Sequence, residues 1–184
     1  YLDSDAPEVV AAALSSLAER KEAHAWDKIK KLAESDAAIV RKNALLALSK
    51  LVSRDDTESS NEVMGILSGA VTSDKSDAVV RTALEQLGTF ESERAVNGIA
   101  IMLNAKEKEM RLTAIKALAN CGHKSAIDLI TDVLGDPNSE IRRAAVEALG
   151  ELGFARAKPK LKARLQEEKD AEIKTLIKET LQKL

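Results

Sequence analysis

Residues Asp136–Leu165, with the sequence DPNSEIRRAAVEALGELGFARAKPKLKARL, have the pattern of one helical hairpin. The first two residues, Asp and Pro, are typical of a helix start, because Asp accepts hydrogen bonds from free backbone N–H groups and Pro suits the first helical turn. Apolar residues then recur every three or four positions, the period of one side of an α-helix: Ile141, Ala144, Ala145, Ala148, Leu149 and Leu152. Gly150 and Gly153 predict the end of this helix, and the residues beyond them predict a second one.

The same pattern recurs along the whole chain. Leucines equivalent to Leu149 stand 31 or 32 residues apart, with one wider interval of 39, at Leu17, Leu48, Leu87, Leu118 and Leu181. One helical pair cannot bury its apolar side alone, so it must stack on copies of itself. The repeat therefore predicts an all-α, right-handed superhelix of about five and a half helical pairs, without strands, in which residues 1–184 form one solenoid.

The consensus D-P-x-x-E-[IV]-R-x-A-A-x-x-A-L-G, followed by R-A-x-P-x-L, resembles the short HEAT-like repeat of the phycobilisome-lyase type. The match is closest at Asp136–Leu165, good at Asp36–Leu51 and Met110–Leu134, and loose at both ends. The resemblance covers nearly the whole chain and implies an α-solenoid that holds other macromolecules. It also implies that arginines and aspartates of successive repeats stack into a structural ladder.

The arginine in the first turn of the repeated helix lies within its apolar arc, where an unpaired charge would be costly. Carboxylates in the preceding turn are the expected partners, Asp136 for Arg142 and Asp36 for Arg41. The ladder is thus predicted to contain Arg41, Arg111, Arg142, Asp36 and Asp136. In the third repeat Val80 takes the arginine's place, so an interruption is expected there. An anion-binding row is the alternative interpretation of these arginines.

Two further columns of the repeated helix face outward on a helical wheel. They predict a binding surface on the concave side of the solenoid, formed by Lys42, Leu46, Arg81, Glu85, Leu112, Lys116, Arg143 and Glu147. The alternative is a solvated face with pairs such as Arg81–Glu85 and Arg143–Glu147. Leu46 and Leu112 favour the binding surface, because solvation does not explain apolar residues in charged rows.

Composition excludes several classes of function. A net charge of −2 gives no overall field that favours nucleic acid or an anionic membrane, and no apolar run approaches the length of a membrane span. The single cysteine, Cys121, excludes an intramolecular disulfide and a Cys-based zinc site. Some HEAT-like enzymes bind iron through His-Glu pairs, but His24 precedes Ala25 and His123 precedes Lys124. We therefore expect no metal and no cofactor.

The function predicted from these features is that of a non-enzymatic scaffold that binds a protein partner. The alternative, which rests on the resemblance alone, is a bilin-lyase-like enzyme or enzyme subunit. The insertion Ser53–Ser60 accounts for the wide interval and predicts a tolerated polar loop, with a binding edge as the alternative. The apolar run VVAAAL in the first helix, which has no helix before it, suggests the C-terminal part of a longer solenoid. The sequence does not indicate a compartment.

Overall fold

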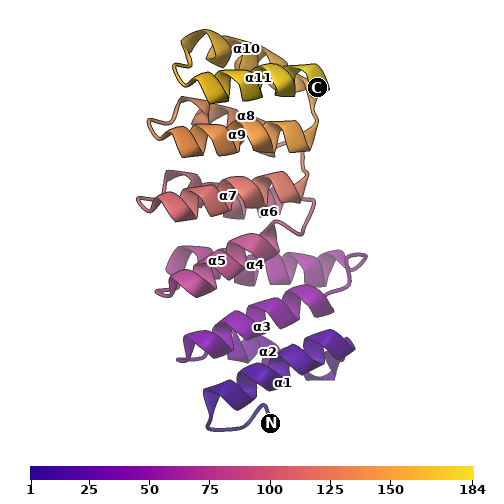
Figure 1. Ribbon diagram of the computed structural model, residues 1–184. Helices are drawn as coiled ribbons and strands as arrows, with labels where there is room; N and C mark the ends of the chain where they lie inside the picture. Colours follow the sequence, from indigo (N-terminus) through magenta and orange to yellow (C-terminus); the bar gives the residue numbers. More distant parts are fainter. The chain divides into compact units, whose positions relative to one another are not determined.

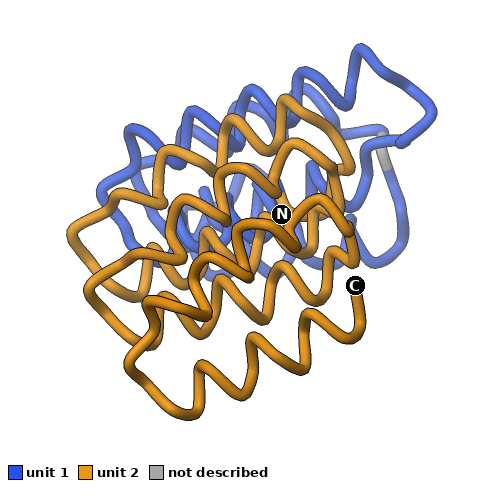
Figure 2. Tube along the Cα trace, turned by 90° about the horizontal axis from the view of Figure 1, so that it is seen from above, with its two compact units in different colours: residues 1–87 blue, residues 88–184 orange. Residues whose placement is uncertain are grey.

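The computed structural model describes residues 1–184, apart from the side chain of Ala23. The described residues form eleven α-helices, four short 3-10 helices and no strand, which confirms the all-α repeat fold. The α-helices are α1 (Pro7–Arg20), α2 (Trp26–Leu32), α3 (Ala38–Leu51), α4 (Thr57–Ser73), α5 (Asp77–Leu87), α6 (Glu93–Ala100), α7 (Lys108–Cys121), α8 (Ala126–Asp132), α9 (Ser139–Leu152), α10 (Lys158–Glu167) and α11 (Ala171–Lys183). The chain divides into two compact units, residues 1–87 and 88–184 (Figure 2).

In the first unit, α1, α3 and α5 form one layer, and α2 and α4 lie behind it (Figure 1). Helix α3 packs against both α1 and α5 within the layer. The buried side chains between the two layers are aliphatic, as the near absence of aromatic residues requires. Those of large volume that are fully buried are Leu14, Ile29, Leu45, Leu48, Leu67, Leu84 and Leu87.

The second unit repeats this arrangement with α7, α9 and α11 in one layer and α6, α8 and α10 in the other (Figure 1). Helix α9 packs against both α7 and α11. Leu118 and Leu149 are fully buried at the same position of the repeat, which is why the leucine spacing predicted the stacking. Within each unit, the odd-numbered helices therefore form one layer, and the predicted surface residues of that unit lie on it.

The ends of α9 differ in detail from those predicted. Asn138, rather than Asp136, caps the helix by accepting hydrogen bonds from the N–H groups of Glu140 at 2.9 Å and Ile141 at 3.3 Å. Gly150 lies inside the helix, and only Gly153 terminates it, with a positive φ of 70° that favours glycine. The prediction placed the start two residues early, because either Asp or Asn can cap a helix.

The predicted loop at Ser53–Ser60 is helical in its second half, so the prediction holds only for residues 53–56. Helix α4 begins at Thr57, where Asp56 accepts hydrogen bonds from the N–H groups of Glu58 and Ser59. The insertion therefore lengthens α4 to 17 residues, compared with 7 in α2. The polar composition suggested a loop, but Asp-Thr-Glu is also a sequence that starts a helix.

Gly88 lies close to the backbone of α7, and this contact predicts a cost for any side chain there. A Cβ at Gly88 would stand 2.8 Å from the carbonyl oxygen of Ala117 and 3.1 Å from its Cα. Because backbone cannot yield locally, we expect Gly88→Ala to lower the free energy of unfolding by about 2 kcal/mol in urea titrations.

Gly150→Ala is the matched control for this prediction, since Gly150 occupies the same position in its own repeat. Its Cβ would meet only the Thr180 side chain, at 3.3 Å from Cγ2, and alanine favours the helix. We expect Gly150→Ala to change stability by less than about 1 kcal/mol. Equal losses for the two variants would contradict the close approach at Gly88.

Candidate functional site

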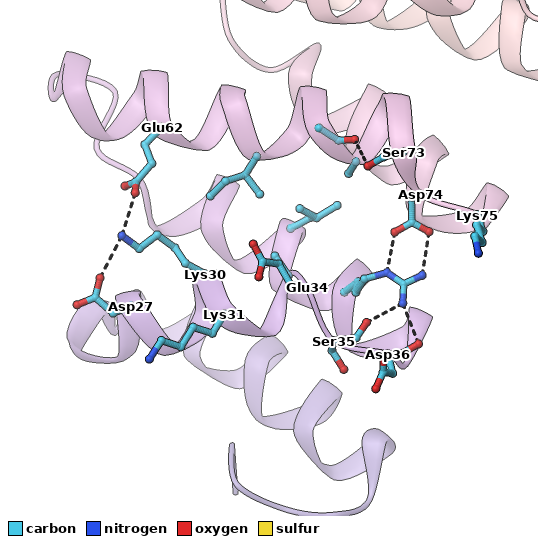
Figure 3. A pocket seen from close by; sticks show the side chains of 16 residues that line it. Asp27, Lys30, Lys31, Glu34, Ser35, Asp36, Glu62, Ser73, Asp74 and Lys75 are labelled. Atoms are coloured by element: carbon cyan, nitrogen blue, oxygen red, sulfur yellow. Dashed lines mark hydrogen bonds and ion pairs between the residues drawn. The ribbon is translucent and has the colours of Figure 1, made fainter.

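Arg41 joins the start of α3 to the turn that follows α4. Its Nε and Nη2 donate to the two carboxylate oxygens of Asp74 at 2.6 and 2.8 Å, and its Nη1 donates to the carbonyl oxygens of Ser35 and Asp36 (Figure 3). The bidentate hydrogen bonds from Arg41 lower the pKa of the Asp74 carboxyl, and burial opposes them. The same pair raises the pKa of Arg41. This guanidinium therefore stays charged and holds two repeats together.

Arg142 makes the same connection from α9 to the turn before α11. Its Nε and Nη2 donate to Glu168 at 2.8 and 2.9 Å, and its Nη1 donates to the carbonyl oxygens of Asp136 and Pro137. The Glu168 side chain is 0% exposed and also accepts hydrogen bonds from Arg164. The hydrogen bonds from Arg142 hold the pKa of Glu168 far below its usual range.

Arg111 forms the weakest of the three links. Its Nη1 donates to the carbonyl oxygens of Ala105 and Lys106 at 2.9 and 3.2 Å, in the pattern of the other two arginines. However, its Nε lies 3.7 Å from Asp136 Oδ2, which is too long for a hydrogen bond, and has no hydrogen-bond partner among the described residues. Part of the burial cost of this guanidinium is therefore not offset.

The pairing differs from the prediction, because each arginine reaches the carboxylate of the following repeat. The preceding turn supplies only backbone carbonyl oxygens, so Asp136 faces Arg111 rather than Arg142, and Arg41 takes the main-chain oxygen of Asp36. Each arginine lies in the first turn of its helix, where its side chain spans the gap to the next repeat. The structure thus adds Asp74 and Glu168 to this set of residues.

A signal for these two acids was present in the sequence. Asp74, Asp136 and Glu168 occupy one column, and each follows a repeat that carries the arginine. Where valine replaces the arginine, the next repeat carries no acid: Val10 precedes Ser35, and Val80 precedes Ala105. Val80 is 7% exposed in α5, whereas its neighbour Arg81 is half-buried.

The outward rows lie on the same face of each odd-numbered layer. In the first unit, Lys42 and Glu85 are exposed, and Leu46 and Arg81 are half-buried. In the second unit, Lys116 and Glu147 are exposed, and Leu112 and Arg143 are half-buried. Both leucines thus protrude less than a helical wheel suggests, since neighbouring helices of the layer cover part of each.

Ion pairs between helices cross this face of the second unit. Lys108 donates to Glu140 at 2.8 Å between α7 and α9, and Arg143 donates to Glu172 at 2.5 Å between α9 and α11. Arg143 therefore pairs with a neighbouring helix and not with Glu147 of its own helix. Exposed ion pairs of this kind stabilise a protein only slightly and are expected on any solvated surface, so they do not indicate a binding site.

Helix α3 departs from this pattern. Ile39 is 45% exposed at a position where other repeats carry glutamate: Glu8, Glu109, Glu140 and Glu172. Leu46, two helical turns further on, stands where other repeats carry Glu85, Lys116 and Glu147. Together with Lys42 between them, these residues form one stripe along the helix, which we call the α3 stripe. The binding surface predicted from the sequence did not include Ile39, although the glutamates at the same position of other repeats could have indicated it.

Comparison with known proteins agrees with this repeat architecture. Residues 97–182 match the family described as HEAT repeats. This match covers most of the second unit, and the first unit is built from helical pairs of the same kind. The phycobilisome-lyase subtype of the repeat stays a prediction. No curated protein sequence matches the chain.

Solved structures similar to this chain include designed armadillo repeat proteins. A designed armadillo repeat protein in complex with the peptide (KR)4 has a TM-score of 0.64 at 20% identity, over 99% of this chain and 95% of that chain. A homology model of the full-length AP-3 complex has a TM-score of 0.75 at 20% identity, over 97% and 34%. Human deoxyhypusine hydroxylase in complex with glycerol has a TM-score of 0.59 at 15% identity, over 99% and 81%. At these identities the likeness shows the fold alone.

Among the described side chains, no group of three or more His, Cys, Asp or Glu is placed to hold a metal ion. His123 Nδ1 instead lies 2.7 Å from the hydroxyl of Ser125 at the start of α8. Within the part of the chain that the structure describes, no helix is long and apolar enough to span a membrane.

Proposed function

We propose that this protein is a non-enzymatic interaction module that holds a protein partner on the outer face of its odd-numbered helices. The α3 stripe carries this proposal. Ile39 exposes nearly half of its surface in a column that holds glutamate in four other repeats and Ala78 in α5, and a large apolar side chain there gives no advantage to a solvated face. A partner that buries Ile39 and the accessible part of Leu46 would gain hydrophobic free energy from both.

The two units differ in how much unpaired apolar surface the predicted binding face exposes. In the second unit, the interhelical pairs Lys108–Glu140 and Arg143–Glu172 cross this face, so these four charges already have partners. The α3 stripe offers apolar surface beside the exposed Lys42. We therefore assign the central contact to the first unit, and expect a partner segment with an apolar side chain next to an acidic one.

The fold is consistent with this function, because HEAT and armadillo solenoids typically bind proteins, and one similar designed protein is described in complex with a peptide. No observation favours the bilin-lyase-like alternative. The charged groups that the structure brings together in the ladder pair with one another and link successive repeats.

Ile39→Glu tests the proposal with little risk to the fold. Because glutamate occupies this position in α7, α9 and α11, we expect the melting temperature to stay within a few degrees of the wild type. The charge would nevertheless be buried against the partner, so recovery of the natural partner in quantitative pull-downs from the source organism should fall about tenfold or more.

Ile101→Glu is the matched control, since Ile101 is 52% exposed and lies at the end of α6, in the other layer. It introduces the same charge in place of the same residue, and partner recovery should not change. If Ile39→Glu retains the partner while Ile101→Glu loses it, the binding face lies on the even-numbered helices instead.

A further inference from the structure

A groove of about 1230 Å³ opens between α2 and α4 in the first unit (Figure 3). It exists because α2 packs on α3, whereas the lengthened α4 packs mainly on α5 and only slightly on α3. The two even-numbered helices therefore do not close over α3, and Arg41 and Leu45 of α3 line the floor. None of the three residues of the α3 stripe lines this groove.

The groove contains an apolar strip among polar and charged lining residues. Leu45 lies at its floor, and α4 contributes the half-buried Ile66 and Ala70. Gly69 lies on the same side of α4, and a Cβ there would meet no atom within 4 Å. The α4 residues of the wall, from Glu62 to Ser73, span about 16 Å at the helical rise. The groove can therefore take apolar side chains along roughly three helical turns.

The charges at one end of the groove leave an excess of negative charge. Lys30 lies 3.0 Å from Asp27 and 2.9 Å from Glu62, so a single ammonium group serves two carboxylates. The excess of one negative charge at this end is solvent-accessible, since the Asp27 side chain is 87% exposed and that of Glu62 is 43% exposed.

The centre and the other end are negative as well. Glu34 has no ion-pair partner among the residues that the structure describes, and its carboxylate points into the space between α2 and α4 (Figure 3). At the far end, the positive charge of Arg41 is paired with Asp74, and the carboxylate of Asp36 is exposed nearby. Lys31 and Lys75 line the rim, but their ammonium groups point away from the space between the helices (Figure 3).

We propose that this groove binds a short, basic, amphipathic segment of a partner protein. Apolar side chains of the segment would cover Ile66 and Ala70, and its lysines or arginines would face Glu34 and the excess carboxylates at both ends. The volume exceeds the range of about 300–1,000 Å³ that is typical of small-molecule sites, which favours a peptide. A helix laid in an apolar groove is a common mode of peptide recognition. The site is independent of the α3 stripe.

A synthetic peptide of about twelve residues, made of Leu, Ala and Lys with Leu along one side, is a suitable probe. Isothermal titration calorimetry at physiological salt should show saturable one-to-one binding to the wild-type protein. A second peptide with Glu in place of every Lys should bind at least about tenfold more weakly. Absence of binding by the Lys peptide up to about 1 mM, or equal binding of the two peptides, would overturn the proposal.

Two variants locate the binding. Glu34→Lys reverses the central charge, and Gly69→Leu places a bulky side chain in the groove at a position where its Cβ meets no atom within 4 Å; each should weaken binding of the Lys peptide about tenfold or more. Glu151→Lys, which changes the net charge equally on α9, should leave the affinity within about twofold. Circular dichroism checks that each variant remains folded.

An affinity that survives both Glu34→Lys and Gly69→Leu, or one that Glu151→Lys weakens equally, would place the peptide elsewhere. Ile39→Glu should not change the affinity of the peptide, so failure of the groove and failure of the α3 stripe are distinguishable. As a second measurement, amide chemical-shift changes on peptide addition should centre on Ile66 and Ala70. Changes centred on Ile39 and Leu46 would refute the groove.

Discussion

Replacing Arg142 with alanine should lower the free energy of unfolding by about 3 kcal/mol, at the lower end of the range for broken buried ion pairs. The loss arises because Glu168 is fully buried and receives its bidentate hydrogen bonds from this guanidinium. Arg164 and the N–H groups of Lys169 and Asp170 remain as donors, so the carboxylate keeps part of its stabilisation. Urea unfolding at neutral pH measures the difference.

Arg111→Ala is the matched comparison, since Arg111 occupies the same position in α7. Its Nε is 3.7 Å from Asp136 and lacks a hydrogen-bond partner among the described residues, so its removal should cost only about 1 kcal/mol. Lys116→Ala, on the exposed face of the same helix, should change stability by less than about 0.5 kcal/mol. Losses of equal size at Arg142 and Arg111 would show that the bidentate geometry has no effect on stability.

The repeat spacing predicted the fold because helix stacking depends on buried side chains that recur at a fixed period. Leu48, Leu87, Leu118 and Leu149 are fully buried at equivalent positions, which a single periodic pattern can indicate. Leu17 is only half-buried, because α1 packs on α3 along one side of the helix. Periodicity therefore identifies the core, while the neighbours of each helix decide how completely a residue is buried.

The ladder was predictable in composition but not in direction. A buried arginine needs a carboxylate partner, and the turns of the repeat contain candidate acids. Whether the arginine pairs with the turn before it or with the turn of the next repeat depends on how far its side chain extends between the stacked helices. Glu168 in place of aspartate made the column harder to see. The groove between α2 and α4 was not predictable, since it depends on how the lengthened α4 shifts its packing toward α5.

Acid should destabilise the protein in large part through Glu168. The hydrogen bonds from Arg142 hold the pKa of this carboxyl far below its ordinary value in the folded state; N–H groups of Asp170, Arg164 and Lys169 act in the same direction, and burial opposes them. In the unfolded chain the carboxyl binds a proton near pH 4.3. The stabilisation is therefore fully present above about pH 5 and is lost progressively as the pH falls toward the folded-state pKa.

We expect the free energy of unfolding to fall by at least about 2 kcal/mol between pH 5 and pH 2 through this group alone. Asp74, whose pKa is lowered by Arg41, adds a loss of the same sign. Glu168→Gln should be less stable than the wild type at pH 7, because it leaves Arg142 without an anionic partner, and its stability should depend less steeply on acid. Urea unfolding at intervals from pH 7 to pH 2 gives both profiles. If the two profiles run parallel, Glu168 is not the carboxyl that links acid to unfolding, and the buried pair with Arg142 has no special weight in holding the last repeats together.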